Sequence, residues 1–195
     1  MDERIDLRCD CGTVRGTVNE VSRANAQRVV CYCRSCRAYA ERLGRTHELD
    51  ALGGTDLVQT TSGRLSLTEG MDRIACMKMT PRGVLRWFAT CCNAPISTCA
   101  PTPALPIYGI RRAALAIDEA ALDRRLGPVS ARVFASHAKG DVRTLGPGTT
   151  RLLPLILRNI RLVLRARRAG EHRRSPFFDP SGQPIRRPLP IPTGS

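Results

Sequence analysis

The chain has 195 residues, of which 42% are hydrophobic and 25% charged; this suits one compact domain with an appendage and excludes a large multidomain machine. Only 4% of the residues are aromatic, and 16 glycines and 14 prolines favour a turn-rich β protein over a helical bundle. Basic residues outnumber acidic ones by 31 to 17, which gives a net charge of +14. This charge fits phosphate or carboxylate partners, and it equally fits a genome biased toward arginine.

Charge divides the chain into two parts. Residues 1–110 carry 14 basic and 11 acidic residues and all nine cysteines, whereas residues 111–195 carry 17 basic and 6 acidic residues. A Pro-rich stretch over residues 101–106 lies near this division. We therefore expect a mainly β, zinc-binding domain over residues 1–110 and a basic, Pro- and Arg-rich, partly helical extension over residues 111–195.

Short strands are expected throughout the first part. Alternating or β-rich segments predict strands, in chain order, at residues 5–8, 13–19, 27–30, 57–61, 64–68, 74–79 and 84–88. The last four should form two β-hairpins, one turning at Ser62-Gly63 and one at Pro81-Arg82-Gly83. One or two helical turns are expected over residues 37–43, ending at Gly44.

The second part changes to a helical period. Residues 118–126 begin with acidic and end with basic side chains before Gly127, which predicts a short helix. A longer helix is expected over residues 150–169, capped by Thr149 or Thr150. It gathers apolar side chains near one face, namely Leu152, Leu153, Ile156, Ile160 and Val163. This face could pack on the sheet, meet another subunit or lie on an anionic membrane, and residues 177–188 are expected to be extended.

Cysteine usage indicates reduced thiols. The nine cysteines are an odd number, and the start of the chain lacks the apolar segment of a signal peptide. Arg158 and Arg161 interrupt the longest apolar candidate, which stays below the roughly 18 residues that cross a bilayer. We therefore expect a cytoplasmic protein without a transmembrane segment, whose thiols are available to metal ions.

Three cysteines within six residues form the strongest motif. Cys31, Cys33 and Cys36 follow a predicted strand, and sulfurs at this spacing can occupy three corners of a tetrahedron around zinc. Arg34 and Arg37 bracket the run and favour thiolate over thiol. A fourth protein ligand would make the zinc structural, whereas an open fourth position would allow Lewis-acid chemistry.

A second set of cysteines is divided between the two ends of the predicted sheet. Cys9 and Cys11 follow the first strand, and Cys91 and Cys92 follow the last hairpin. Ligands from both places would hold a structural zinc and tie the sheet together. Because adjacent cysteines rarely bind one ion with good geometry, we favour Cys92 over Cys91 and keep Cys99 as a substitute.

The remaining candidates favour structural roles. Cys76 lies in a predicted strand, where a small buried thiol is favoured over a fourth ligand or a reactive group. His47, His137 and His172 are dispersed without metal-binding spacing. Trp87 is expected in the core, because no aromatic nucleic-acid motif surrounds it.

The order of the cysteine motifs resembles that of the glutathione-dependent formaldehyde-activating enzymes and the related centromere protein V group. The shared pattern is C-x-C-G, then C-x-C-x-x-C about twenty residues later, then a cysteine pair with Pro after a hairpin, over roughly residues 5–100. The resemblance implies an all-β, tent-like zinc fold. The family's last motif is C-x-x-C-G, so its first cysteine falls on Ala89 and its glycine on Asn93.

The resemblance also implies roles for the cysteines. Cys9, Cys11 and Cys92 match the ligands of a structural zinc. The central trio matches the ligands of a second zinc, which meets the thiol of glutathione and helps to form S-hydroxymethylglutathione. Two zinc ions are therefore expected in one chain.

Two functions compete on these grounds. The first is a carbon–sulfur lyase-like enzyme in which zinc on the trio activates a small thiol such as glutathione for addition to an aldehyde, and Arg34 or Arg37 steers its carboxylates. The second is a non-catalytic zinc module whose basic tail docks on a partner protein, a nucleic acid or a membrane. A homo-oligomer is compatible with either function.

Overall fold

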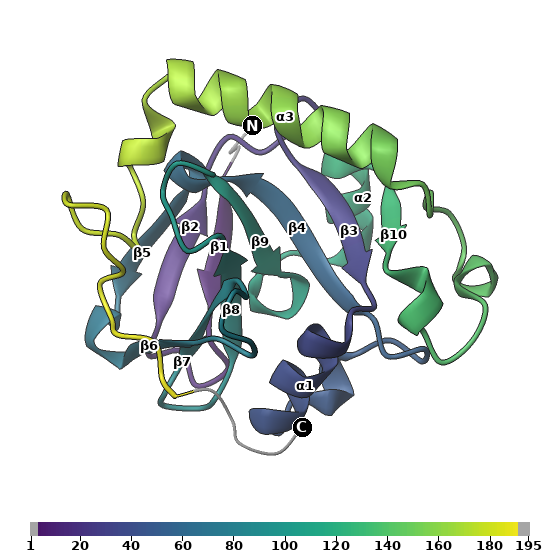
Figure 1. The fold of residues 1–195 in the computed structure, drawn as a ribbon, viewed down its shortest axis with the longest axis horizontal. Coiled ribbons are helices and arrows are strands. Elements are labelled where there is room, and N and C mark those ends of the chain that lie inside the picture. The colour runs from purple at the N-terminus through teal and green to yellow at the C-terminus, as the bar shows by residue number, and fades with distance from the viewer. Residues whose placement is uncertain (1–3, 191–195) are drawn as a thin grey trace.

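A computed structural model of the chain describes residues 4–190 and is mainly β, as predicted (Figure 1). The strands are β1 (Ile5–Arg8), β2 (Arg15–Val18), β3 (Gln27–Cys31), β4 (Thr55–Thr61), β5 (Leu65–Glu69), β6 (Ile74–Met77), β7 (Leu85–Ala89), β8 (Pro95–Cys99), β9 (Ile107–Arg111) and β10 (Ala131–Val133). The α-helices are α1 (Arg34–Arg42), α2 (Glu119–Leu126) and α3 (Leu152–Arg168). The predicted helical character of the C-terminal part is confirmed.

The strands form two sheets. The larger has seven strands in the order β10-β3-β4-β9-β8-β7-β6, and the smaller has three in the order β1-β2-β5. Neighbouring strands pair antiparallel, except that β10 runs parallel to β3. The larger sheet thereby brings the end of β3, which carries Cys31, beside β10, a strand from the second half of the chain.

One of the two predicted hairpins is wrong. β6 and β7 pair antiparallel as expected, but β4 and β5 belong to different sheets. The helical turn Ser62–Arg64 redirects the chain, and β5 pairs with β2. Gly16 in β2 permits this close approach, because a Cβ there would lie 2.2 Å from the carbonyl oxygen of Ser66. Alternation of apolar residues predicted both strands but contains no information about their partners.

The main core lies where residues from both halves of the chain meet. Trp87 of β7 is fully buried and stacks on Phe177, with ring centroids 4.4 Å apart and planes 5° from parallel. Tyr108 of β9 belongs to the same buried cluster, and its ring centroid lies 5.7 Å from that of Phe177. Residues 111–190 thus share a core with residues 4–110, while the division into two domains stays a prediction.

The expected turns and caps of the helices are partly confirmed. Asp118 caps α2 by accepting from the Ala121 N–H at 2.7 Å, and the helix ends at Gly127 as predicted. α3 instead begins after Arg151, which provides no side-chain cap. Neither of the two expected caps, Thr149 and Thr150, serves as the N-cap, and Thr149 donates its backbone N–H to the carbonyl of Ser130 and so continues the edge of the sheet.

The C-terminal segment is less extended than expected. Phe178 and Pro184 pair across a turn in which the Asp179 carboxylate accepts backbone N–H groups. The chain then runs beside β6, where Leu189 donates its N–H to the carbonyl of Cys76 at 2.8 Å. The prediction of an extended segment is therefore wrong for residues 179–182, which form this turn.

Candidate metal centres

The trio lies where β3 passes into α1. Cys31 is the last residue of β3, Cys33 is the N-cap of α1 and Cys36 lies in its first turn. The cap explains why α1 begins at Arg34 instead of residue 37: the Cys36 N–H donates to the Cys33 sulfur at 3.3 Å. The three sulfurs lie within 4.8 Å of one another, and Cys31 and Cys36 are buried.

The surroundings of the trio favour one thiolate. Contacts with the sulfurs of Cys31 and Cys36 lower the pKa of Cys33 far below its usual range, and the Ser35 hydroxyl adds to this effect. Contacts with the sulfurs of Cys33 and Cys36, and then burial, raise the pKa of Cys31. The N-terminus of α1 also favours negative charge at its cap. A cation that replaces the thiol protons would therefore meet converging sulfur ligands.

Arg86 of β7 supplies positive charge to the trio. Its side chain is buried, its Nη1 lies 3.6 Å from the Cys36 sulfur, and its Nη2 donates to the Ser35 hydroxyl at 2.8 Å. The guanidinium also lies over the Tyr39 ring, 5.2 Å from its centroid. Three thiolates and a divalent cation sum to one negative charge, which a buried guanidinium would balance.

The sequence did not reveal the role of Arg86 and instead favoured Arg34 and Arg37 of α1. Arg34 is exposed, and Arg37 donates to the carbonyl of His137 at 2.5 Å. A signal for Arg86 is present in the sequence, since it is the one charged residue in the run Leu85–Ala89, whose members are all buried. A charged residue in such a strand requires a buried partner.

Replacing Arg86 by Met is expected to weaken metal binding at the trio by roughly 10- to 100-fold, the range typical of lost outer contacts to metal ligands. Arg86→Lys, which keeps the charge, should retain most of the affinity. Competition titration with a chromophoric zinc chelator would measure the affinity of the trio, and the separate cluster of Cys9, Cys11, Cys91 and Cys92 is the internal control. Equal losses for the Met and Lys variants would show that charge is not the cause.

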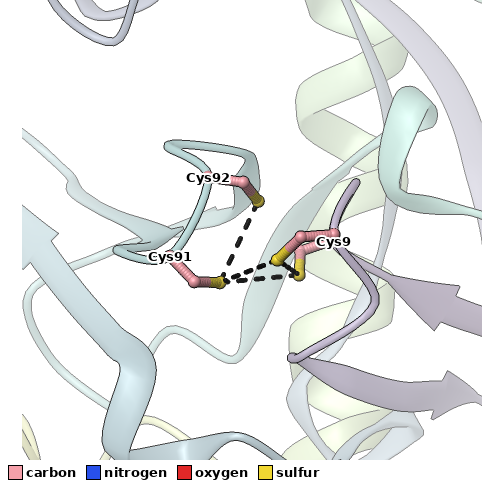
Figure 2. A group of neighbouring side chains, drawn as sticks. Cys9, Cys91 and Cys92 are labelled. Carbon is pink, nitrogen blue, oxygen red and sulfur yellow. Dashed lines mark hydrogen bonds between the residues drawn. The ribbon is translucent and has the colours of Figure 1, made fainter.

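The second cluster joins two distant turns. Cys9 and Cys11 lie in the turn after β1, and Cys91 and Cys92 lie in the turn between β7 and β8. Figure 2 shows Cys91 and Cys92 on one turn facing Cys9 on the other. The Cys9 sulfur accepts the Val14 N–H at 3.2 Å, which fixes its orientation. All four sulfurs lie within 4.8 Å of one another.

The distances in this four-cysteine cluster fit a tetrahedral metal site. The sulfurs are separated by 3.5 Å for Cys9–Cys11, 3.8 Å for Cys9–Cys91, 3.2 Å for Cys11–Cys91 and 4.0 Å for Cys91–Cys92. Metal–sulfur bonds of about 2.3 Å in a tetrahedron place sulfurs about 3.8 Å apart. A disulfide requires about 2.05 Å, and all the cysteines are free thiols. The residues present therefore fit a metal ion.

Cys11 is the readiest thiolate of this cluster. Hydrogen bonds with the hydroxyl and then the backbone N–H of Thr13 lower the pKa of Cys11 to about 6, and contact with Cys91 adds to this effect. Desolvation, and then the contact with Cys11, raises the pKa of Cys91 to about 12. Each cluster thus contains one cysteine with a lowered pKa, Cys33 in the trio and Cys11 here, next to a cysteine whose pKa is raised, Cys31 and Cys91 respectively.

The turn between β7 and β8 explains how two adjacent cysteines reach one cluster. Asn93 adopts a left-handed conformation with φ of 56°, which turns the chain immediately after Cys92. Both sulfurs thereby lie near Cys9, and the structure gives no ground for preferring Cys92 to Cys91. Cys99, the suggested substitute, is buried elsewhere and accepts the Trp87 indole N–H at 3.3 Å.

Asn93→Ala is expected to destabilise the protein by roughly 1–2 kcal/mol, because a β-carbon without a local polar partner is strained at positive φ. Asn93→Gly should be tolerated, since glycine adopts this conformation without strain. Urea unfolding of both variants would measure the difference in the free energy of unfolding. Equal stabilities would contradict the left-handed turn.

Cys76 belongs to neither cluster. It is fully buried in β6, its thiol donates to the carbonyl of Arg186 at 3.3 Å, and burial raises its pKa to about 11. The structural role favoured for Cys76 thus agrees with its position. Among residues 4–190, the grouped metal-binding side chains are all cysteines, and the three histidines lie outside both groups.

Within the described part of the chain, no helix has both the length and the apolar character needed to cross a bilayer. None of the curated proteins compared with the chain matches it. A Rhodobacter sphaeroides protein of known crystal structure is 21% identical, with 64% of this chain and 96% of that chain covered and a TM-score of 0.42. The sequence pattern of DUF6151, described as a family of unknown function, matches residues 1–187, and the chain belongs to this family.

Proposed function

We propose that the trio binds zinc with an open fourth position and that the protein adds a small thiol, such as glutathione, to an aldehyde. The observation that carries this proposal is the contrast between the two clusters. Among residues 4–190, the trio has no fourth cysteine, histidine or carboxylate in its group, whereas the other cluster has four cysteines. Structural zinc sites are closed by four protein ligands, and catalytic sites keep one position open.

The donor sets support zinc as the metal. Sulfur-only sites with tetrahedral spacing are typical of zinc and of iron–sulfur centres, and single ions with four thiolates are typical of zinc. The four-cysteine cluster would then be a structural site that ties the turn after β1 to the turn between β7 and β8. Two ions per chain follow from the two groups.

The resemblance of the cysteine motifs to those of formaldehyde-activating enzymes supports the choice of reaction. The family's glycine falls on Asn93, whose φ of 56° is a conformation that glycine adopts freely. The departure from C-x-x-C-G is therefore compatible with the same turn. The family's first cysteine falls on Ala89, and Cys91 supplies the sulfur in its place.

The chemistry would use the chain as follows. Zinc supplies a Lewis-acidic position that favours the thiolate form of a thiol at neutral pH. Arg86 balances the negative charge of the trio, and exposed Arg34, next to Cys33, can bind a carboxylate of the thiol compound. The substrate sulfur forms a bond to the aldehyde carbon, the C=O π bond breaks, and the thiol proton ends on the resulting oxygen.

The test is a rate measurement on protein loaded with two zinc ions. Adduct formation from glutathione and ¹³C-formaldehyde would be followed by NMR against the uncatalysed reaction. We expect acceleration that Cys33→Ser abolishes, together with the loss of one of the two ions. Cys76→Ser is the matched control, because Cys76 lies outside both clusters, and it should retain the rate and both ions. No acceleration by the fully loaded protein would overturn the proposal.

Burial of the trio favours a second candidate function, a non-catalytic zinc module. Cys31 is 7% and Cys36 5% exposed, so that only Cys33 offers partial access to a substrate. In that case the fully loaded protein would show no acceleration, and Cys33→Ser would lower stability without changing any rate.

A further inference from the structure

α3 is fixed to the body of the protein along one face. Leu162 and Ala166 are buried, and Leu155 packs against the cluster that includes Cys31. Arg158 donates to the carbonyl of Ala26 at 2.8 Å, and Gln27 donates to the Asn159 side chain at 3.1 Å. These contacts settle which face of α3 points inward.

The opposite face is apolar and exposed. At about 100° per residue, six large apolar side chains share an arc of about 140°. We call them the apolar stripe of α3: Leu152, Leu153, Ile156, Leu157, Ile160 and Leu164, between 43% and 65% exposed. Figure 1 shows α3 along the outer margin of the molecule. The stripe continues into a groove of about 400 Å³ that α3 forms with the loop at Leu105, itself 52% exposed. Exposed apolar surface of this extent marks a binding surface.

Positive charge flanks the stripe. Arg161, Arg165 and Arg168 are exposed and lie on the arc next to it. From Val142 to Gly170 the chain has seven arginines and no acidic residue. The surface that covers α3 must therefore accept apolar side chains and arginines together.

This combination distinguishes among three occupants. A nucleic acid would neutralise the arginines but leave the leucines and isoleucines in water. A second copy of the chain would bring another helix of the same positive charge to the stripe, and the two would repel each other. An anionic bilayer offers phosphate groups above an apolar interior, which matches both features.

We propose that α3 docks the protein on an anionic membrane surface, lying parallel to the bilayer with the apolar stripe in the boundary between headgroups and acyl chains. The flanking arginines then contact lipid phosphates. The buried face of α3 keeps its present contacts, so docking requires no unfolding. This inference is independent of the proposed function, because neither cysteine cluster takes part.

The test is co-sedimentation of the full chain with vesicles at physiological salt. The vesicles contain either phosphatidylserine and phosphatidylcholine in a 3:7 ratio or phosphatidylcholine alone. We expect at least tenfold stronger binding to the anionic vesicles. The pair Arg161→Gln and Arg165→Gln should weaken it roughly 30-fold, from about 1 kcal/mol per arginine near such a surface. The pair Leu153→Ser and Ile160→Ser, at exposed positions that leave the fold intact, should weaken it at least tenfold.

A control pair isolates position from net charge. Arg42→Gln and Arg82→Gln remove two exposed arginines outside α3, and this pair should bind anionic vesicles like the wild type. An equal loss with the control pair would overturn the proposal, as would failure of the wild type to bind anionic vesicles. A dimer in solution that Leu153→Ser and Ile160→Ser dissociate, without vesicle binding, would assign the stripe to a second copy.

Discussion

Cys91→Ser is expected to lower the free energy of unfolding of the metal-loaded protein by several kcal/mol, on the order of 5 kcal/mol if the ion is lost altogether. The physical reason is that Cys91 lies close to both Cys9 and Cys11, with sulfur distances of 3.8 Å and 3.2 Å. An ion held there joins the turn after β1 to a turn about 80 residues later, and the unfolded chain has no such preformed site. Urea unfolding would measure the effect.

The exposure of Cys91 makes this experiment selective. Cys91 is an exposed thiol, so its replacement by Ser in the metal-free protein should change stability by no more than about 0.5 kcal/mol. A chelator should therefore destabilise the wild type by several kcal/mol more than the variant, in which only the trio can still hold an ion. If both proteins lose the same stability on chelation, the four-cysteine cluster does not hold the stabilising ion.

Phe177→Ala is expected to cost about 3–5 kcal/mol, because it removes a fully buried ring from the core and leaves a cavity. The ring lies 4.4 Å from the ring of Trp87 and 5.7 Å from that of Tyr108, and stacked aromatic pairs add to the cost of lost burial. Urea unfolding followed by the fluorescence of Trp87 would report the loss directly.

Phe134→Ala is the matched control for this substitution. Phe134 is 50% exposed, and we expect a loss of less than about 1 kcal/mol on its removal. Similar losses for the two variants would mean that the contact between Phe177 and Trp87 does not hold the C-terminal segment to the sheet.

The sequence was most informative where ligands are close together in the chain. The trio is local, so its spacing predicts convergence, and the spacing of Cys9 and Cys11 does the same. The contact of Arg86 with Cys36 and the pairing of β5 with β2 join segments that lie far apart in the sequence, and no local pattern identifies those partners. The helix period predicted that Ile156 and Ile160 share a face, but not that this face points away from the sheet.

The stacking of Phe177 on Trp87 also sets an order of events during synthesis. The ribosome makes Phe177 about 90 residues after Trp87, which takes roughly 5–18 s at typical rates of elongation. For that interval the indole lacks its covering ring, and the nascent polypeptide presents an unfinished apolar surface to chaperones and to other nascent chains. A message truncated before codon 177 would yield a product that stays in this vulnerable condition.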